Sequence, residues 1–79
     1  MASAEMPGAI IKRELEARGW TQTDLAFILG RQQPEISAII LGKRSISPEV
    51  AHELAAALGH DAHYWLSLEA AYHASRVTP

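Results

Sequence analysis

Residues 20–42 read WTQTDLAFILGRQQPEISAIILG, and this stretch carries the signals for two short helices joined by a tight turn. Thr21 is a residue type that caps helices, and Asp24 follows it at the spacing of a capping box. A helix is therefore expected over Gln22–Leu29, with Gly30 ending it.

Both helices of this stretch have an apolar side that should face a core. The second helix is expected over residues 33–41, because Pro34 is tolerated in a first turn and Gly42 provides a stop. The expected buried residues are Leu25, Ile28 and Leu29 in the first helix and Ile36, Ile39 and Ile40 in the second. The turn between them spans about residues 30–32, which is the length that a helix-turn-helix needs over residues 22–41.

Helix signals recur on both sides of this motif, whereas no strand pattern and no internal repeat occurs. Helices are expected over residues 7–18, residues 48–58 and about residues 61–75, with Gly19 and Gly59 ending the first two of these. Five short helices in 79 residues predict a single all-α domain, with residues 1–6 and 76–79 as flexible ends.

The composition limits the environment and the partners. There are no cysteines, which excludes disulfides and thiolate metal sites and fits a reducing cytoplasm. No apolar run reaches the roughly 18 residues of a membrane span, and residues 1–7 lack the features of a secretory signal.

The charge is unevenly distributed, although the net charge is only −2. Residues 1–44 carry six Lys or Arg and five Asp or Glu, a balance of +1, whereas residues 45–79 carry one and four, a balance of −3. The first part is expected to face phosphate and the second part a basic partner. The alternative explanation is ordinary solubilising surface charge.

No catalytic or metal-binding constellation is expected. His52-Glu53 begins like the zinc-protease motif HExxH, but Ala56 stands where the second histidine is required. Residues 60–63 offer two histidines and an aspartate without an obvious fourth ligand. No phosphate-binding glycine loop and no nucleophile motif occurs, so neither an enzyme nor a cofactor is predicted.

The order of short motifs along the chain, such as Arg18-Gly19-Trp20-Thr21-Gln22 and Ile46-Ser47-Pro48-Glu49, carries a family resemblance. Between Met6 and about Tyr72 the motifs lie at residues 7–8, 14–22, 24–26, 29–30, 36–37, 39, 42–44, 46–49, 54–55, 57–59 and 65–72. With them the chain resembles the Cro/C1-type (XRE) helix-turn-helix family, which has a lambda-repressor-like fold, and within it the HigA-like antitoxins.

The resemblance implies a sequence-specific DNA-binding repressor that forms a homodimer on a palindromic operator in its own promoter. It also implies a partner toxin, typically an mRNA-cleaving ribonuclease. In this family the second helix of the motif enters the major groove. The resemblance places the base-contacting positions at Gln32, Gln33, Pro34, Ser37 and Ala38.

The chemistry of these side chains divides them into those that can hydrogen-bond to a base edge and those that can make only apolar contacts. Glutamine can pair with adenine and serine with either kind of base edge, whereas proline and alanine can only meet a thymine methyl group. Gln32 and Gln33 are the expected direct readers, with helix capping or phosphate binding as the alternative. Leu41 stands where the family commonly has asparagine, which leaves few polar groups and favours modest or shape-based specificity.

Phosphate contacts would position the domain on DNA. Gln22 at a helix start, and the cations Arg31, Lys43 and Arg44, are the candidates. A carboxylate at position 35 would oppose binding if it were unpaired near phosphates. We therefore expect Glu35 to point sideways and pair with Arg31.

Side chains on the last helix are expected to form the dimer interface: Tyr64, Leu68 and Tyr72. Such an interface would place two recognition helices about 34 Å apart, one turn of DNA. Closure of the core is the alternative explanation, above all for Leu68.

Two other functions fit the sequence. One is a protein-interaction module whose acidic second half neutralises a basic ribonuclease, with DNA binding secondary, and it can coexist with repression. The other is the N-terminal DNA-binding part of a longer regulator.

Overall fold

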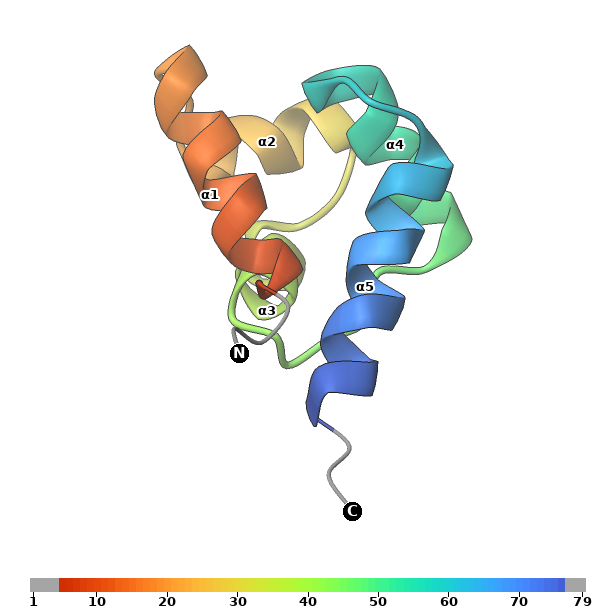
Figure 1. The fold of residues 1–79 in the computed structure, drawn as a ribbon. Helices are drawn as coiled ribbons and strands as arrows, with labels where there is room; N and C mark the ends of the chain where they lie inside the picture. Colours follow the sequence, from red (N-terminus) through yellow and green to blue (C-terminus); the bar gives the residue numbers. More distant parts are fainter. Residues whose placement is uncertain (1–4, 77–79) are drawn as a thin grey trace.

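The computed structural model describes residues 5–76, and the side chains of residues 5–74 within them. The described elements are α1 (Pro7–Arg18), α2 (Gln22–Leu29), α3 (Gln33–Ile40), α4 (Pro48–Leu58) and α5 (Ala62–Arg76) (Figure 1). No strand occurs within residues 5–76. The predicted all-α architecture is confirmed, and the predicted helix bounds agree to within one residue.

The chain ends that were expected to be flexible are only partly described, because residues 1–4 and 77–79 lie outside the described residues. The described residues at these ends have the following contacts and positions. Arg13 donates two hydrogen bonds to the carboxylate of Glu5, and Met6 is the half-buried N-cap residue of α1. Arg76 is the last residue of α5.

The corner between α2 and α3 forms as the sequence predicts. The Thr21 hydroxyl accepts a hydrogen bond from the Asp24 backbone N–H at 3.0 Å, and the Thr21 N–H donates to the Asp24 carboxylate at 2.8 Å. These bonds satisfy two donors that a helix start leaves free. Gly30 ends α2 at φ 70°, a left-handed conformation that favours glycine.

The core is built from one side of every helix. Trp65 of α5 is fully buried, and its indole N–H donates to the Gly59 carbonyl at 3.1 Å. The other buried apolar residues are Ile10, Ile11, Leu15, Leu25, Ala26, Ile36, Ile39, Ile40, Ile46, Val50, Ala51, Leu54 and Leu58. The predicted inward side of α3 is therefore confirmed, and α3 presents its remaining side outward.

The predicted buried side of α2 is partly wrong. Ile28 is 46% exposed, and Ala26 is buried in its place beside Leu25, while Leu29 is half-buried. On a helix with 100° per residue, residues 25, 26 and 29 form one stripe, and residue 28 lies at its edge. Packing of α2 against both α3 and α4 extends the stripe to Ala26 and leaves Ile28 at the surface.

A close backbone contact fixes where α3 lies. A side chain added at Gly8 of α1 would place its Cβ 1.9 Å from the Ile40 carbonyl oxygen at the end of α3. Only glycine permits this approach. Because of it, the start of α1 anchors the C-terminal end of α3.

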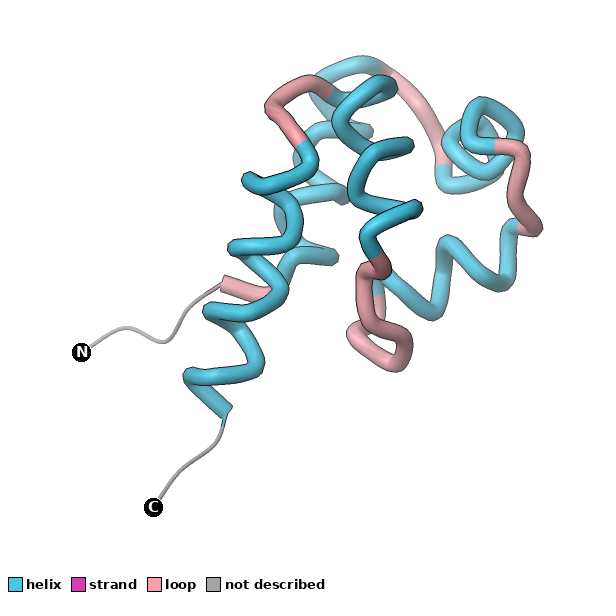
Figure 2. The backbone as a smooth tube through the Cα atoms, turned by 90° about the vertical axis from the view of Figure 1, so that its right-hand side faces the viewer, coloured by secondary structure: helices cyan, strands magenta, loops and turns pink. Residues whose placement is uncertain are grey.

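The helices enclose the core. α3 lies in the lower part of the molecule as drawn in Figure 1. The first turn of α1 and the last turns of α5 lie at this end (Figures 1 and 2). α5 packs against both α1 and α4, while α2 and α3 pack against each other, α2 also against α4 and α3 also against α1. This arrangement places the two helices of the motif on one side of the fold.

Candidate nucleic-acid interface

The outer side of α3 is an exposed surface with few polar groups. With its isoleucines buried in the core, α3 turns outward the residues that line a shallow hollow: Gln33, Pro34, Ser37, Ala38 and Leu41, joined by Lys43 of the following loop. Both glutamines predicted as readers, Gln32 and Gln33, are exposed. The hollow therefore contains four of the five predicted base-contacting residues, and Gln32 lies just before it.

A hydrogen bond joins the first residues of α2 and α3. The Gln33 amide Nε2 donates to Oε1 of Gln22 at 3.3 Å. Gln22 lies in the first turn of α2, where free backbone N–H groups and the helix dipole favour an anion. The bond leaves the Gln33 carbonyl oxygen and the Gln22 amide N–H groups available, so the two amides form one polar edge beside the hollow.

Sequence reasoning named both glutamines but missed the bond between them. The residues are 11 positions apart on different helices, so no helical periodicity relates them. Only the angle of the corner at Gly30 brings them together.

Arg31 lies in a cluster with two carboxylates. Its Nη1 donates to Glu35 at 2.7 Å, while its Nε and Nη2 donate to the two oxygens of Glu53 at 2.6 and 3.0 Å. These bonds, first those to Glu53 and then that to Glu35, raise the pKa of Arg31 above its ordinary value. The predicted sideways pose of Glu35 is confirmed.

The same cluster argues against the predicted phosphate contact of Arg31. Its side chain is only 20% exposed, and two carboxylates compensate its charge. Sequence reasoning missed Glu53 because this residue lies on α4, 22 positions away. The role that the contacts support for Arg31 is to tie α4 to the corner between α2 and α3.

Lys43 and Arg44 follow α3 on an exposed loop. The Lys43 backbone N–H donates to the Ala38 carbonyl at 2.9 Å, which holds the loop against the end of α3. Within the described residues, the Lys43 ammonium group makes no ion pair. Arg44 is 59% exposed and lies 3.7 Å from Glu35, at the outer limit of an ion pair. Both cations can reach an anion beside the hollow.

The predicted dimer residues on α5 are partly engaged within the monomer. Tyr64 stacks on His60 with ring centroids 3.9 Å apart, and Leu68 packs half-buried against the core. Tyr72 is half-buried beside Met6 and Ile39. Each keeps some exposed surface, so a dimer contact through α5 stays a prediction.

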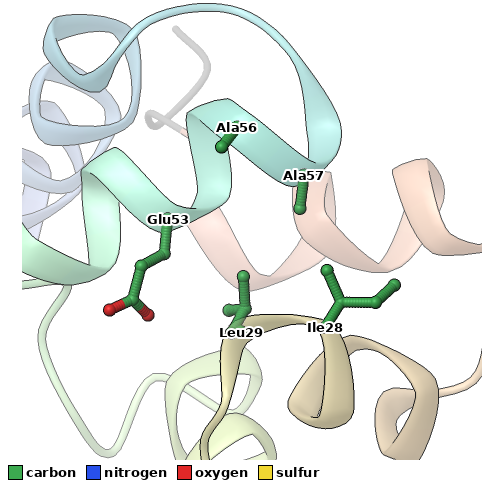
Figure 3. A pocket seen from close by; sticks show the side chains of 5 residues that line it. All are labelled: Ile28, Leu29, Glu53, Ala56 and Ala57. Atoms are coloured by element: carbon green, nitrogen blue, oxygen red, sulfur yellow. The ribbon is translucent and has the colours of Figure 1, made fainter.

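An apolar surface that sequence reasoning missed lies over α2 and α4. Ile28 and Leu29 face Ala56 and Ala57 across a shallow hollow (Figure 3). A second hollow adjoins it through Ile28 and contains Trp20, Thr23, Asp24 and Phe27. Phe27 is 87% exposed, which is unusual for a side chain of this size. We call the residues of both hollows the α2–α4 surface.

Neither a metal site nor a membrane span is found in the part of the chain that the structure describes. No three side chains among its histidines, aspartates and glutamates gather in a way that could hold a metal ion. None of the described helices has the length and apolar character needed to cross a membrane.

Comparisons with known proteins agree with this geometry. A family model described as helix-turn-helix matches residues 11–65. Virulence-associated protein A of Dichelobacter nodosus is 40% identical over 81 residues, which cover 100% of this chain and 79% of that protein.

Solved structures with the same fold include an addiction module antidote protein of the HigA family from Coxiella burnetii. The TM-score is 0.87 at 28% identity, with 99% of each chain covered. Another is a Pseudomonas aeruginosa protein in complex with its 18 bp operator DNA, with a TM-score of 0.85 at 26% identity, covering 95% of this chain and 81% of that one. The chain belongs to the helix-turn-helix family, of the XRE type and the HigA-like antitoxin branch.

Proposed function

We propose that the protein is a DNA-binding antitoxin that represses its own operon by placing α3 in the major groove of an operator. The observation that carries the proposal is the exposed outer side of α3 with the joined amides of Gln22 and Gln33 at its start. A protein of the same fold has been solved on its operator DNA.

The dimensions of α3 suit this role. An α-helix with its side chains is about 10–12 Å in diameter and the major groove is about 12 Å wide, so a helix such as α3 can lie in the groove. With α3 in the groove, Gln33 can present its carbonyl oxygen to the N6 amino group of an adenine, while Gln22 supports it and binds phosphate. Gln32, Ser37, Pro34 and Ala38 complete the proposed base contacts.

The phosphate contacts are proposed to come from two cations of each protomer, Lys43 and Arg44. Arg31 is omitted from this set because its guanidinium is bound by Glu35 and Glu53. In a homodimer four cations contact the DNA, for which counterion release gives a slope of log K against log salt of about −3.6.

The homodimer is proposed to form through α5, with Tyr64, Leu68 and Tyr72 in contact across a two-fold axis. A two-fold dimer requires a palindromic operator with half-sites about one helical turn apart. The proposal places the protein in the cytoplasm, where its DNA is found.

The direct test is a titration of labelled duplex DNA from upstream of its own gene with the purified protein. We expect saturable binding that exceeds binding to a shuffled duplex, weakens with salt and protects two half-sites. Lys43→Glu should weaken binding to both duplexes, whereas Lys12→Glu, a matched change on the exposed side of α1, should have little effect. Equal affinity for the operator and the shuffled duplex would contradict the proposal.

A second function, neutralisation of a toxin, is favoured by the α2–α4 surface. Its exposed Phe27 and Ile28 lie beside the carboxylate of Asp24, and neither hollow contains a basic residue. Such a surface suits a protein segment that is both apolar and basic, as a nucleic-acid-binding toxin would offer.

This second function is tested by co-expressing the protein with the product of its neighbouring gene. Phe27→Asp should abolish the complex and restore toxicity, while the DNA-face variant Gln33→Ala should keep the complex. Charge reversal at Glu49, which is exposed and makes no ion pair within the described residues, should weaken the complex without unfolding the protein. A neighbour that is neither bound nor toxic would refute the toxin partner.

A further inference from the structure

We propose that the hollow on the outer side of α3 is a site for the 5-methyl group of a pyrimidine, so that the protein accepts thymine or 5-methylcytosine at a position where it disfavours cytosine. The inference rests on the proposed insertion of α3 into the major groove. It goes further by naming the chemical group that is read and the residue that reads it, Leu41.

The walls of the hollow are apolar at the place where DNA recognition usually relies on hydrogen bonds. Pro34, Ala38 and Leu41 form the apolar part of its lining, and Leu41 is 58% exposed. A large apolar side chain that the fold leaves uncovered gains free energy only when a partner covers it. In the major groove the one apolar group on a base edge is the methyl group at C5 of thymine.

The polar groups around the hollow fit the same assignment. Glu35, the one carboxylate in α3, turns away to Arg31 and is 19% exposed, so it does not offer an acceptor to the N4 amino group of cytosine. Ser37 contributes a hydroxyl whose hydrogen bonds are unfilled within the described residues. A hydroxyl donates to O4 of thymine or accepts from N4 of 5-methylcytosine. The polar groups therefore admit both bases, and the methyl group distinguishes both of them from cytosine.

Leu41 is the residue that sets this preference. It lies seven residues after Pro34, about 10 Å along the helix axis, and closes the end of the hollow nearest the Lys43 loop. Alanine at this position would leave the groove open to solvent. Covering one methyl group is worth a change in affinity of about fourfold.

The test uses the full chain and its operator, first mapped by footprinting upstream of its gene. Each thymine is replaced singly by deoxyuridine, which removes only the methyl group. Affinity is measured for wild type, Leu41→Ala and the control Phe27→Ala, whose exposed side chain lies on the α2–α4 surface. At the responsive position, cytosine and 5-methylcytosine duplexes are then compared.

We expect one or two thymines in each half-site at which deoxyuridine weakens wild-type binding about fourfold. At such a position 5-methylcytosine should bind more tightly than cytosine. Phe27→Ala should keep both effects, and Leu41→Ala should reduce them to less than about twofold. Operator binding that is indifferent to deoxyuridine at every position, or a full methyl effect in Leu41→Ala, overturns the methyl site alone. Failure of the wild type to bind any duplex specifically overturns the proposed function as well.

Discussion

Arg31 and Lys43 differ in the ion pairs that they make within the fold. The Arg31 guanidinium connects Glu35 of α3 with Glu53 of α4, and a half-buried pair of this kind depends on both partners being present. Lys43, only a short distance along the chain, has no such partner within the described residues. Two cations that look alike in the sequence therefore differ in how far the fold compensates their charge, and we expect different roles for them.

Replacing these two cations should separate the roles. Arg31→Ala should destabilise the fold by about 1–3 kcal/mol, because two carboxylates lose their charged hydrogen bonds, and should leave the salt slope of DNA binding unchanged. Lys43→Ala should leave the melting temperature nearly unchanged and make the slope of a dimer shallower by about 1.8, one phosphate contact for each protomer. Thermal melts and salt titrations of the two variants measure both quantities, and a changed slope in Arg31→Ala would restore its phosphate role.

At the scale of helices, the start of α2 helps to position Gln33, one of the proposed base-contacting residues. The Thr21 and Asp24 bonds fix the first turn of α2, and Gln22 lies in that turn beside Gln33. Loosening this turn should therefore affect both stability and DNA recognition.

Thr21→Ala should lower the free energy of unfolding by about 1 kcal/mol, since one helix donor loses its acceptor. Thr21→Ser keeps the hydroxyl and should restore most of the loss. Chemical denaturation measures the effect. Equal stability of the alanine and serine variants would mean that the capping box contributes nothing.

The contact between α1 and α3 gives a second prediction at this scale. Gly8→Ala drives a methyl group into the Ile40 carbonyl, so we expect a loss of about 1–3 kcal/mol and a displaced α3. Gly19→Ala is the control, because nothing lies within 4 Å of its Cβ and only the strain of φ 71° acts, about 1 kcal/mol. If Gly8→Ala were the milder of the two changes, the close approach would be wrong.

Local signals made the helices predictable, and long-range packing made the rest unpredictable. Thr21, Gly30 and Ser47 report on their own neighbours, so the helix bounds follow from the sequence. The exposure of Ile28 and the bond between Arg31 and Glu53 depend on how α2 meets α4. A single sequence contains no periodicity that relates α2 to α4, so neither feature could be predicted before the fold was known.

At the scale of the whole molecule, the small core favours association. A domain of this size buries only about 60% of its unfolded surface, and a dimer contact adds to that burial. A dimer also doubles the number of phosphate contacts, which one small protomer offers only in limited number.

Variants on α5 test this assembly. Tyr72→Ala should shift sedimentation from dimer towards monomer and weaken operator binding, while circular dichroism stays helical. The exposed change His52→Ala on α4 is the control and should leave the dimer intact. A dimer that persists in Tyr64→Ala and Tyr72→Ala alike would place the interface elsewhere than on α5.

The central claim is that the outer side of α3 reads bases, and the affinity of wild type and Gln33→Ala for a set of single-base variants of the operator tests it most directly. Wild type should lose about 1–3 kcal/mol of binding free energy when one particular base pair in each half-site is changed, and Gln33→Ala should no longer distinguish that base pair while still distinguishing the others. A Gln33→Ala protein with the wild-type pattern of preferences, or with a uniform loss at every position, would contradict it.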